Sequence, residues 1–154
     1  MFIYKTGNLL NSVADALVNT VNCVGVMGKG IALMFKEQYP YNFLKYKEVC
    51  SKQLVKIGEM FIVEENDIFN NKKLIINFPT KIHWKYPSEY TYIEKGLVAL
   101  RQEIINRQIK SIAIPALGCS NGGLNYNLVK PMIETILKDL NCIIYLYECT
   151  YFIN

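Results

Sequence analysis

Two glycine-rich loops, each set between an apolar strand and a helix, constrain the fold of this chain more than any other sequence feature. The first loop, GVMGKG at residues 25–30, comes shortly after the apolar run ADALVNTVN and leads into IALMFKEQYP. The second loop, GCSNGG at residues 118–123, follows KSIAIPAL and leads into LVKPMIETILKDL. Strand–loop–helix units of this kind build α/β domains, which bind ligands at the carboxyl ends of their strands.

The rest of the chain alternates between the same two types of element. Short runs rich in β-branched and aromatic residues predict strands at 1–6, 59–65, 73–79 and 142–148. A long helix is predicted over 88–108, because Ile93, Leu97, Leu100 and Ile104 fall on one of its faces. The stretch 40–50 has an ambiguous period. No repeat or linker interrupts the pattern, so we predict one three-layer α/β domain over residues 1–154.

Composition limits the size of the core and the kind of partner. At 154 residues with 51% hydrophobic side chains, the chain can bury one sizeable core. Its formal charge of +4 permits an anionic ligand but is too small to indicate nucleic-acid binding. No stretch has the length of a membrane span or the pattern of a secretory signal, which favours a cytoplasmic protein with no membrane partner.

Cysteine and histidine usage indicates a reducing compartment. The cysteines are odd in number, widely spaced and without a C-x-x-C pair: Cys23, Cys50, Cys119, Cys142 and Cys149. This pattern is not that of a disulfide framework. Because His83 is the only histidine, ordinary zinc-ligand spacing is absent. The sequence predicts no metal site and no cofactor.

The glycine loops have the properties of a phosphate-binding site. A helix N-terminus presents unpaired N–H groups and a partial positive charge, so it favours an anion. Glycine permits a positive φ and lets a phosphate approach without meeting a Cβ. The two loops are therefore candidates to hold a pyrophosphate from two sides. Ordinary turns remain the alternative for either loop alone, since neither matches a P-loop or a dinucleotide fingerprint.

Three stretches, in this order and at these separations, resemble a macrodomain: ALVNTVNCVGVMGKGIALMFK, INFPTKIHW and IAIPALGCSNGGL. More closely, they are similar to the branch that holds the terminal ADP-ribose protein glycohydrolase and the macrodomain of the DNA ADP-ribosyl glycohydrolase antitoxin (DarG). The resemblance runs from about Gly7 to Glu148. It implies an α/β/α fold with a mixed, roughly six-stranded sheet and a cleft for ADP-ribose at its top.

The resemblance also implies which residues bind ADP-ribose. Asn8 stands where the family usually has an aspartate that accepts from the adenine amino group, and Ser120 replaces a glycine common in the second loop. Asn22 matches the asparagine that contacts the distal ribose. Tyr147 is a candidate to flank adenine, or else a core residue. The other implied binding residues are Gly7, Leu9, Gly28, Lys29, Gly30, Ile31, Thr80, Pro115, Leu117, Gly118, Cys119, Asn121, Gly122, Gly123 and Leu124.

Lys81 is the main catalytic candidate. It follows the end of a predicted strand, which points it toward the same cleft. In the related glycohydrolases, the lysine here is thought to attack the anomeric carbon of the distal ribose, which requires an uncharged amine. Partial burial or the charge of Lys29 can lower its pKa. Asn22 is expected to orient the ribose, and His83 either assists proton transfer or packs against Trp84 within its loop.

The identity of Gly122 favours DNA as the acceptor of ADP-ribose. The protein-directed glycohydrolase carries an aspartate at this position, whereas the DNA-directed type has paired glycines. The stretch HWKYP offers aromatic surface and Lys85 for an unpaired base or a DNA phosphate, or else forms a hydrophobic lid. We therefore expect a hydrolase that removes ADP-ribose from bases of single-stranded DNA, as in a toxin–antitoxin system, and whose further partner is a DNA-modifying toxin.

Two alternatives use the same cleft. One is a hydrolase of ADP-ribose attached to protein carboxylates, or of O-acetyl-ADP-ribose, in which only the leaving group differs. The other is a reader that binds ADP-ribose without turnover, from which Lys81 distinguishes both hydrolases. Antitoxins of the resembling type often carry a further C-terminal region that this chain lacks, so we expect either a fragment or a stand-alone enzyme.

Overall fold

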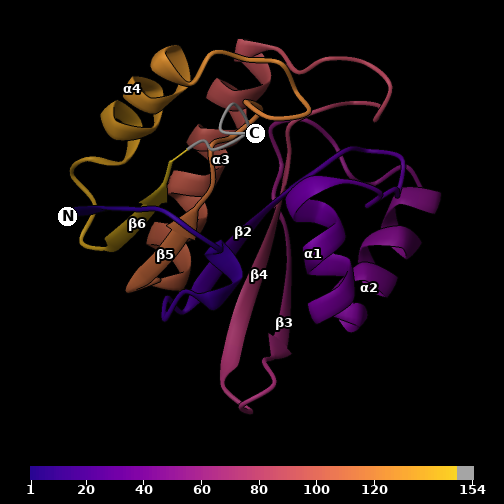
Figure 1. Cartoon of the computed structure of the whole chain (residues 1–154), viewed down its shortest axis with the longest axis horizontal. Helices are drawn as coiled ribbons and strands as arrows, with labels where there is room; N and C mark the ends of the chain where they lie inside the picture. Colours follow the sequence, from indigo (N-terminus) through magenta and orange to yellow (C-terminus); the bar gives the residue numbers. More distant parts are fainter. Residues whose placement is uncertain (149–154) are drawn as a thin grey trace.

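A computed structural model describes residues 1–148, which form one mixed sheet with helices on both of its faces (Figure 1). The strands are β1 (Phe2–Lys5), β2 (Ala16–Val21), β3 (Phe61–Asn66), β4 (Lys72–Pro79), β5 (Ser111–Ile114) and β6 (Ile143–Tyr147). Their order is β1-β6-β5-β2-β4-β3, and every pair is parallel except β3–β4. The structure confirms the predicted three-layer α/β fold with a mixed sheet of six strands.

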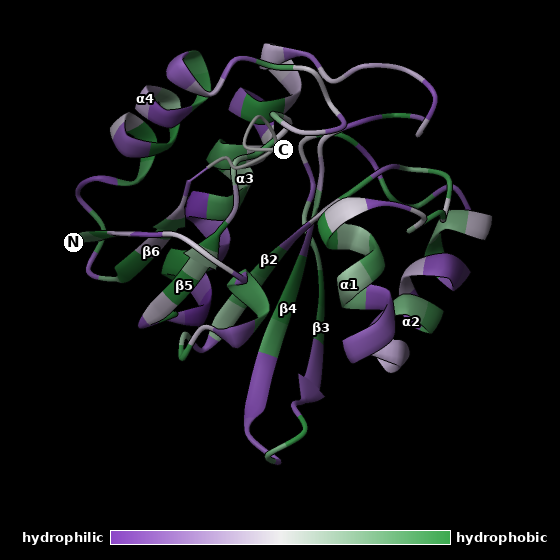
Figure 2. Ribbon diagram, viewed as in Figure 1, coloured by the Kyte–Doolittle hydropathy of each residue, from purple (hydrophilic) through white to green (hydrophobic). Residues whose placement is uncertain are grey.

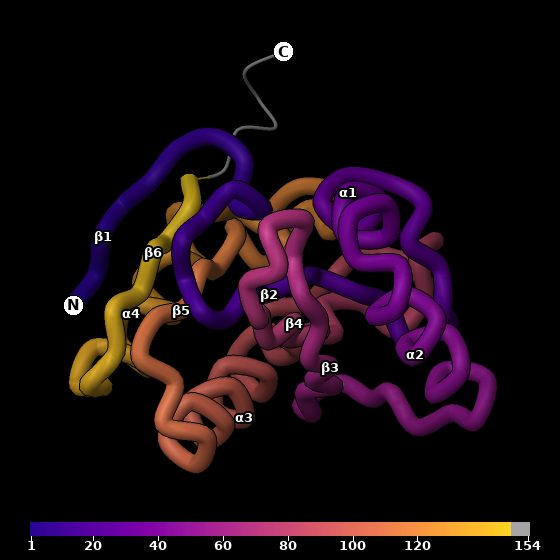
Figure 3. Tube along the Cα trace, turned by 90° about the horizontal axis from the view of Figure 1, so that it is seen from below, coloured from indigo at the N-terminus to yellow at the C-terminus, as the bar shows by residue number. Residues whose placement is uncertain are grey.

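Four α-helices cover the sheet within the described part of the chain: α1 (Gly30–Gln38), α2 (Pro40–Ser51), α3 (Tyr90–Arg107) and α4 (Tyr126–Leu137). Helices α1 and α2 lie on one face and α3 and α4 on the other, which is clearest in the view from below (Figure 3). The ambiguous stretch 40–50 is helical. Pro40 occupies the first turn of α2, where its missing N–H is not needed.

Hydrophobic cores form on both faces of the sheet because side chains alternate along the strands. Val18 of β2 and Phe78 of β4 pack under α3 and α4, whereas Leu17 packs with Phe35 of α1 on the other face. The middle of the sheet is accordingly hydrophobic, while the helices turn polar residues outward (Figure 2). A Cβ at Gly96 would overlap the Phe78 ring, so α3 packs closely on β4.

The carboxyl ends of β2, β4 and β5 meet at one edge because these neighbouring strands are parallel. Val21 pairs with Pro79 in the register of β2 and β4. Beyond the strands, the Thr80 amide donates to the Val21 carbonyl at 2.9 Å and the Cys23 amide donates to the Ile82 carbonyl at 3.0 Å. The segments that follow β2 and β4 therefore leave the sheet side by side.

Some local structure differs from the sequence-based expectation. Leu9–Asn11 form a 3₁₀ turn that no apolar period predicts. Its N-terminus is capped by one side chain, since the Leu10 amide donates to Asn8 Oδ1 at 3.0 Å. Helix α4 begins at Tyr126, earlier than expected, because the Asn125 side chain accepts from the Asn127 amide and caps it.

Within the described segment, no disulfide bond joins the cysteines, which are Cys23, Cys50, Cys119 and Cys142. Cys149 lies outside the described residues. Among residues 1–148, none of the helices combines the length and apolar character needed to cross a membrane. Within the same range, His, Cys, Asp and Glu side chains do not gather into a group able to hold a metal ion.

Candidate functional site

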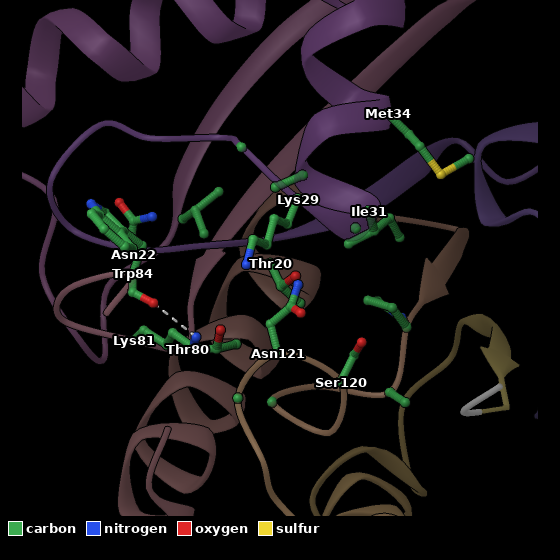
Figure 4. A pocket seen from close by; sticks show the side chains of 18 of the residues that line it. Thr20, Asn22, Lys29, Ile31, Met34, Thr80, Lys81, Trp84, Ser120 and Asn121 are labelled. Atoms are coloured by element: carbon green, nitrogen blue, oxygen red, sulfur yellow. Dashed lines mark hydrogen bonds between the residues drawn. The ribbon is translucent and has the colours of Figure 1, made fainter. Parts of the chain in front are cut away.

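An elongated cleft of about 1040 Å³ opens over the carboxyl ends of β2, β4 and β5 (Figure 4). The two glycine loops form its walls. Most of the residues predicted from the sequence line it, namely Gly7, Asn8, Leu9, Asn22, Gly28, Lys29, Gly30, Ile31, Thr80, Lys81, Pro115, Gly118, Ser120, Asn121, Gly122, Gly123 and Tyr147. A volume of this size is at the upper end of the range for small-molecule sites.

The first loop delivers the N-terminus of α1 into the cleft. Lys29 is the N-cap residue, and its side chain makes no capping hydrogen bond, so the first amides of the helix remain available to a ligand. Gly30 has a φ of +57°, and a Cβ there would lie 3.1 Å from Asn121 Nδ2 of the second loop. The two loops therefore approach each other across the cleft at Gly30 and Asn121.

The second loop is anchored by apolar side chains that point away from the cleft. Leu117, Cys119 and Leu124 were predicted to bind ligand, but their side chains are buried in the core under α3 and α4 and do not line the cleft. Gly118, with a φ of +72°, accepts from the Leu124 amide at 2.9 Å. Burial of the apolar side chains holds the loop, which leaves its glycine backbone facing the cleft.

Asn22 organises the first loop. Its Oδ1 accepts from the amides of Val24 at 3.0 Å and Val26 at 3.4 Å, and its Nδ2 donates to the Val26 carbonyl at 2.7 Å. Buried Tyr46 of α2 donates its hydroxyl to Asn22, whose main-chain oxygen lies at 2.7 Å and Oδ1 at 2.9 Å. Asn22 lines the cleft, but most of its hydrogen-bonding capacity is used within the protein.

Lys81 lies half-buried at the same end of the cleft as Asn22, and its Nζ donates to the Trp84 carbonyl at 3.2 Å (Figure 4). Burial lowers the pKa of this amine, and the nearby positive charge of Lys29 lowers it further. The thiol of neighbouring Cys23 behaves in the opposite way, because burial raises its pKa to about 11. Burial therefore favours the uncharged, nucleophilic form of Lys81 and disfavours the thiolate of Cys23.

Gly122 cannot carry a side chain in this loop conformation. A Cβ at this position would overlap the Gly118 carbonyl oxygen and lie 2.9 Å from the carbonyl carbon of the same residue. Buried Ser88 fixes the loop to the neighbouring strand, since its amide donates to the Gly122 carbonyl at 2.9 Å and its hydroxyl donates to the Thr80 carbonyl. A carboxylate at position 122 would require a different backbone.

His83 does not line the cleft. Its ring packs against Trp84 and Tyr86, with ring centroids 5.1 and 5.7 Å apart, and its Nδ1 accepts from the Lys85 amide at 3.1 Å. Two roles were expected for His83, proton transfer or packing within its loop, and the structure shows it packed within its loop. The loop around it, residues 82–87, forms the rim of the cleft beside Lys81 and is called the aromatic loop below.

The opposite end of the cleft is apolar and carries one acidic residue. Tyr147 is nearly buried, and Asn8 is exposed with its Oδ1 already accepting from the Leu10 amide. Glu148 lines this end and forms an ion pair with Lys130 at 2.9 Å. Met34 also lines the cleft and lies far from Lys81 (Figure 4).

Several residues that shape the cleft escaped the sequence analysis. Thr20, Met34 and Glu148 line it, and Tyr46 and Ser88 support it by hydrogen bonds. Thr20 lies one residue before β2 ends, so its position at the end of an apolar run could have indicated from the sequence that it lines the cleft. Nothing in the local sequence indicates Tyr46 or Ser88, because the loop residues that they hold, Asn22 and Gly122, are distant in the chain.

The fold and the cleft together define a class of protein: an α/β domain that presents two glycine loops and a helix N-terminus to an anionic ligand at the carboxyl edge of its sheet. The model of the Macro domain family matches residues 18–133. The chain belongs to the macrodomain family, as its resemblance had indicated.

The chain is also similar to longer proteins. It is 47% identical over 148 residues to the DNA ADP-ribosyl glycohydrolase of Mycobacterium tuberculosis, an alignment covering 94% of this chain and 42% of that relative. The solved macrodomain of M. tuberculosis DarG superposes with a TM-score of 0.93 and 45% identity over 97% of this chain and 98% of that one. The chain thus spans about two fifths of the length of the curated relatives it matches.

A third similar protein comes from Thermosipho africanus. It is named a DNA ADP-ribosyl transferase-DNA ADP-ribosyl glycohydrolase fusion protein and is 34% identical over 155 residues, covering 92% of this chain and 40% of that relative. Its solved structure, DarTG in complex with ADP-ribose, has a TM-score of 0.86 and 33% identity over 94% of this chain and 41% of that one.

Proposed function

We propose that this protein is an ADP-ribosyl glycohydrolase that removes ADP-ribose from DNA bases. The observation that carries the proposal is the position of Lys81, an amine with a lowered pKa at the end of a cleft suited to a diphosphate. The names of the similar proteins from M. tuberculosis and T. africanus support the reaction class and the DNA acceptor.

The pyrophosphate of ADP-ribose would bind between the two glycine loops. The open amides at the start of α1 and the glycine backbone of the second loop provide hydrogen-bond donors without side chains in the way. Adenine would then occupy the apolar end near Tyr147 and Met34, and the distal ribose the end that holds Asn22 and Lys81.

The reaction would proceed in two displacements at the distal ribose. The uncharged Lys81 amine forms a bond to the anomeric carbon as the glycosidic bond to the base breaks, and the electron pair of that bond stays on the base. The proton released from the attacking amine replaces the lost bond on the base. Water then displaces the lysine, which yields ADP-ribose and the free enzyme.

Charge distribution supports DNA over a protein acceptor. The charged residues that line the described cleft are Lys29, Lys81, Lys85 and Glu148, and Glu148 is neutralised by Lys130 at the far end. The Lys81 end therefore carries no carboxylate, and Lys29 and Lys85 give it positive charge even while Lys81 is uncharged, which attracts a phosphate backbone. The glycine at position 122 also leaves no room for the aspartate carried there by the protein-directed enzymes.

We further propose that the chain counteracts a DNA-modifying transferase, as an antitoxin does. The T. africanus relative, in which a transferase and a glycohydrolase share one chain, supports this pairing. Cysteines that form no disulfide within the described residues favour a reducing, cytoplasmic location.

Two substrates test the proposal: a single-stranded oligonucleotide with ADP-ribose on one base, and a protein with ADP-ribose on carboxylates. We expect release of ADP-ribose from the oligonucleotide by the wild-type chain and none by Lys81→Ala. Calorimetry should detect binding of free ADP-ribose to the wild-type chain and to Lys81→Ala. Release from the protein alone would refute the DNA acceptor, and binding without release from either would identify a reader.

A further inference from the structure

The aromatic loop exposes large apolar side chains beside the cleft. Ile82, Trp84 and Tyr86 are 54%, 53% and 61% exposed. Trp84 and Tyr86 also line the cleft, together with Lys85 between them. Exposed aromatic rings that alternate with a cation at the mouth of a site are typical of a surface that binds a ligand.

This loop is held in shape by its own residues. The His83 ring contacts the rings of Trp84 and Tyr86, and its Nδ1 accepts from the Lys85 amide. A second bond runs from the Tyr86 amide to the His83 carbonyl at 3.2 Å. Because these contacts exist without a ligand, little ordering cost remains when one binds.

The loop lies on the side from which the leaving group departs. Lys81 Nζ donates to the Trp84 carbonyl, and Asn22, Lys81 and Trp84 lie together at one end of the cleft (Figure 4). With ADP-ribose filling the rest of the cleft, the group bonded to its distal ribose can extend only toward this end. That group therefore meets the rings of the aromatic loop first.

We infer that the aromatic loop binds the nucleobase that carries ADP-ribose and its neighbour in a single strand, with Trp84 and Tyr86 as stacking surfaces. This inference rests on the proposed function and specifies its substrate. Stacking on a side chain requires an unpaired base, so the loop selects single-stranded over duplex DNA. Lys85, placed between the two rings in sequence, pairs with a backbone phosphate.

Charge around the loop favours a nucleic acid over an acidic peptide with no stacking groups. Lys29, Lys81 and Lys85 line this end of the cleft, and the one carboxylate among the described lining residues is Glu148 at the other end. A single strand supplies both of the features that this surface matches, since it has flat bases and one negative charge per nucleotide.

Kinetics on two substrates test the inference: an ADP-ribosylated single-stranded oligonucleotide, and the same ADP-ribosylated base as a free nucleoside. We expect Trp84→Ala to lower kcat/KM on the oligonucleotide by about tenfold to a hundredfold, from the usual value of base–aromatic stacking. Tyr86→Ala should act more on the oligonucleotide than on the nucleoside, because it would lose the neighbouring base. The Kd for free ADP-ribose should stay unchanged in both variants.

Two control variants come from the chain itself. Ile82→Ala removes an exposed apolar side chain of the same loop that does not line the cleft, and Phe69→Ala removes an aromatic ring that is 78% exposed at the β3–β4 turn. Both should behave as wild type. Circular dichroism reports the folding of each variant, and Trp84→Phe, which keeps a stacking ring, should retain most of the activity.

The possible outcomes distinguish a failure of this inference from a failure of the proposed function. If the wild type cleaves the oligonucleotide and neither Trp84→Ala nor Tyr86→Ala slows it, the inference is wrong while the function stands. An equal loss of free ADP-ribose binding would also overturn it, since the loop would then serve the nucleotide-sugar. If the wild type cleaves only ADP-ribosylated protein, the proposed function fails first.

Discussion

The hydroxyl of Tyr46 lies 2.7 Å from the main-chain oxygen of Asn22 and 2.9 Å from its side-chain oxygen, inside the layer between α2 and the sheet. This buried contact joins a helix to the loop that bounds one end of the cleft. Asn22 in turn holds the amides of Val24 and Val26, so the shape of the first glycine loop depends on a residue that does not touch the cleft.

Removing the Tyr46 hydroxyl tests this dependence. We expect Tyr46→Phe to lower the free energy of unfolding by about 1–3 kcal/mol, because Asn22 loses a buried donor. Turnover of ADP-ribosylated DNA should fall several-fold, mainly in kcat. Urea unfolding and steady-state kinetics measure the two effects, and Tyr41→Phe, half-exposed on the same helix, is the matched control. Unchanged stability and kcat in Tyr46→Phe would contradict the role of this bond.

Lys81→Ala should abolish turnover and leave ADP-ribose affinity within a few-fold of wild type. In the proposed mechanism this side chain attacks the sugar, and in the structure its Nζ donates to the Trp84 carbonyl. The sugar adduct on Lys81 can open its ring to an imine, which borohydride added during turnover should reduce to a stable product that mass spectrometry locates. Lys52→Ala, exposed at the end of α2, serves as the control. Normal turnover by Lys81→Ala would exclude the lysine mechanism.

The pH dependence of the rate follows from the lowered pKa of Lys81. Only the uncharged amine attacks, so kcat should rise with pH and level off above the pKa of Lys81, which burial and Lys29 place below the usual lysine value. Lys29→Ala removes the repelling charge, so the pKa of Lys81 should rise and the profile should move to higher pH. Lys29→Arg keeps the charge and should not move it. An equal shift of the pH profile in Lys29→Ala and Lys29→Arg would show that Lys29 acts on substrate binding and not through its charge on the pKa of Lys81.

Gly122→Ala should displace the second loop, because a Cβ there meets the backbone of Gly118. We expect ADP-ribose affinity to fall by about tenfold or more, consistent with the cost of local overpacking. Gly123→Ala places its Cβ in open space at a φ of +79° and should have a smaller effect. Calorimetry with ADP-ribose compares the two. Equal affinities for wild type and Gly122→Ala would show that the loop is not held in this conformation.

His83 offers a test of catalytic against structural roles. If it only holds the aromatic loop, His83→Ala should weaken turnover of the oligonucleotide about as much as Trp84→Ala does and leave the pH profile unchanged. Loss of a limb from the pH profile, with the oligonucleotide KM unaffected, would instead support proton transfer by His83. The kinetic measurements above supply both readouts.

Much of the fold was predictable because strand and helix patterns are local. The apolar face of α3, from Ile93 to Ile104, and the glycine loops after β2 and β5 follow from spacing alone. The pairing of β2 with β4, which brings the Lys81 segment beside the Asn22 loop, depends on contacts between distant segments. The resemblance to macrodomains supplied that information, and periodicity did not.

The supporting residues of the site were not predictable in the same way. Tyr46 and Ser88 hydrogen-bond to the main-chain oxygens of Asn22 and Gly122, which lie far along the chain, and such bonds leave no pattern in the sequence. The sequence also did not show that Leu117, Cys119 and Leu124, which lie in the loop motif, turn their side chains into the core. A motif identifies a segment, whereas the direction of each side chain depends on the packing around it.

The contact between Gly122 and Gly118 also limits how position 122 can change during evolution. A single nucleotide change turns each glycine codon into a codon for aspartate or glutamate, so the mutation itself is easy to reach. In this protein its product would collide with the main chain before any new chemistry began. Selection could therefore admit the acidic residue only after substitutions elsewhere had reshaped the turn, which makes the order of those changes a record of ancestry.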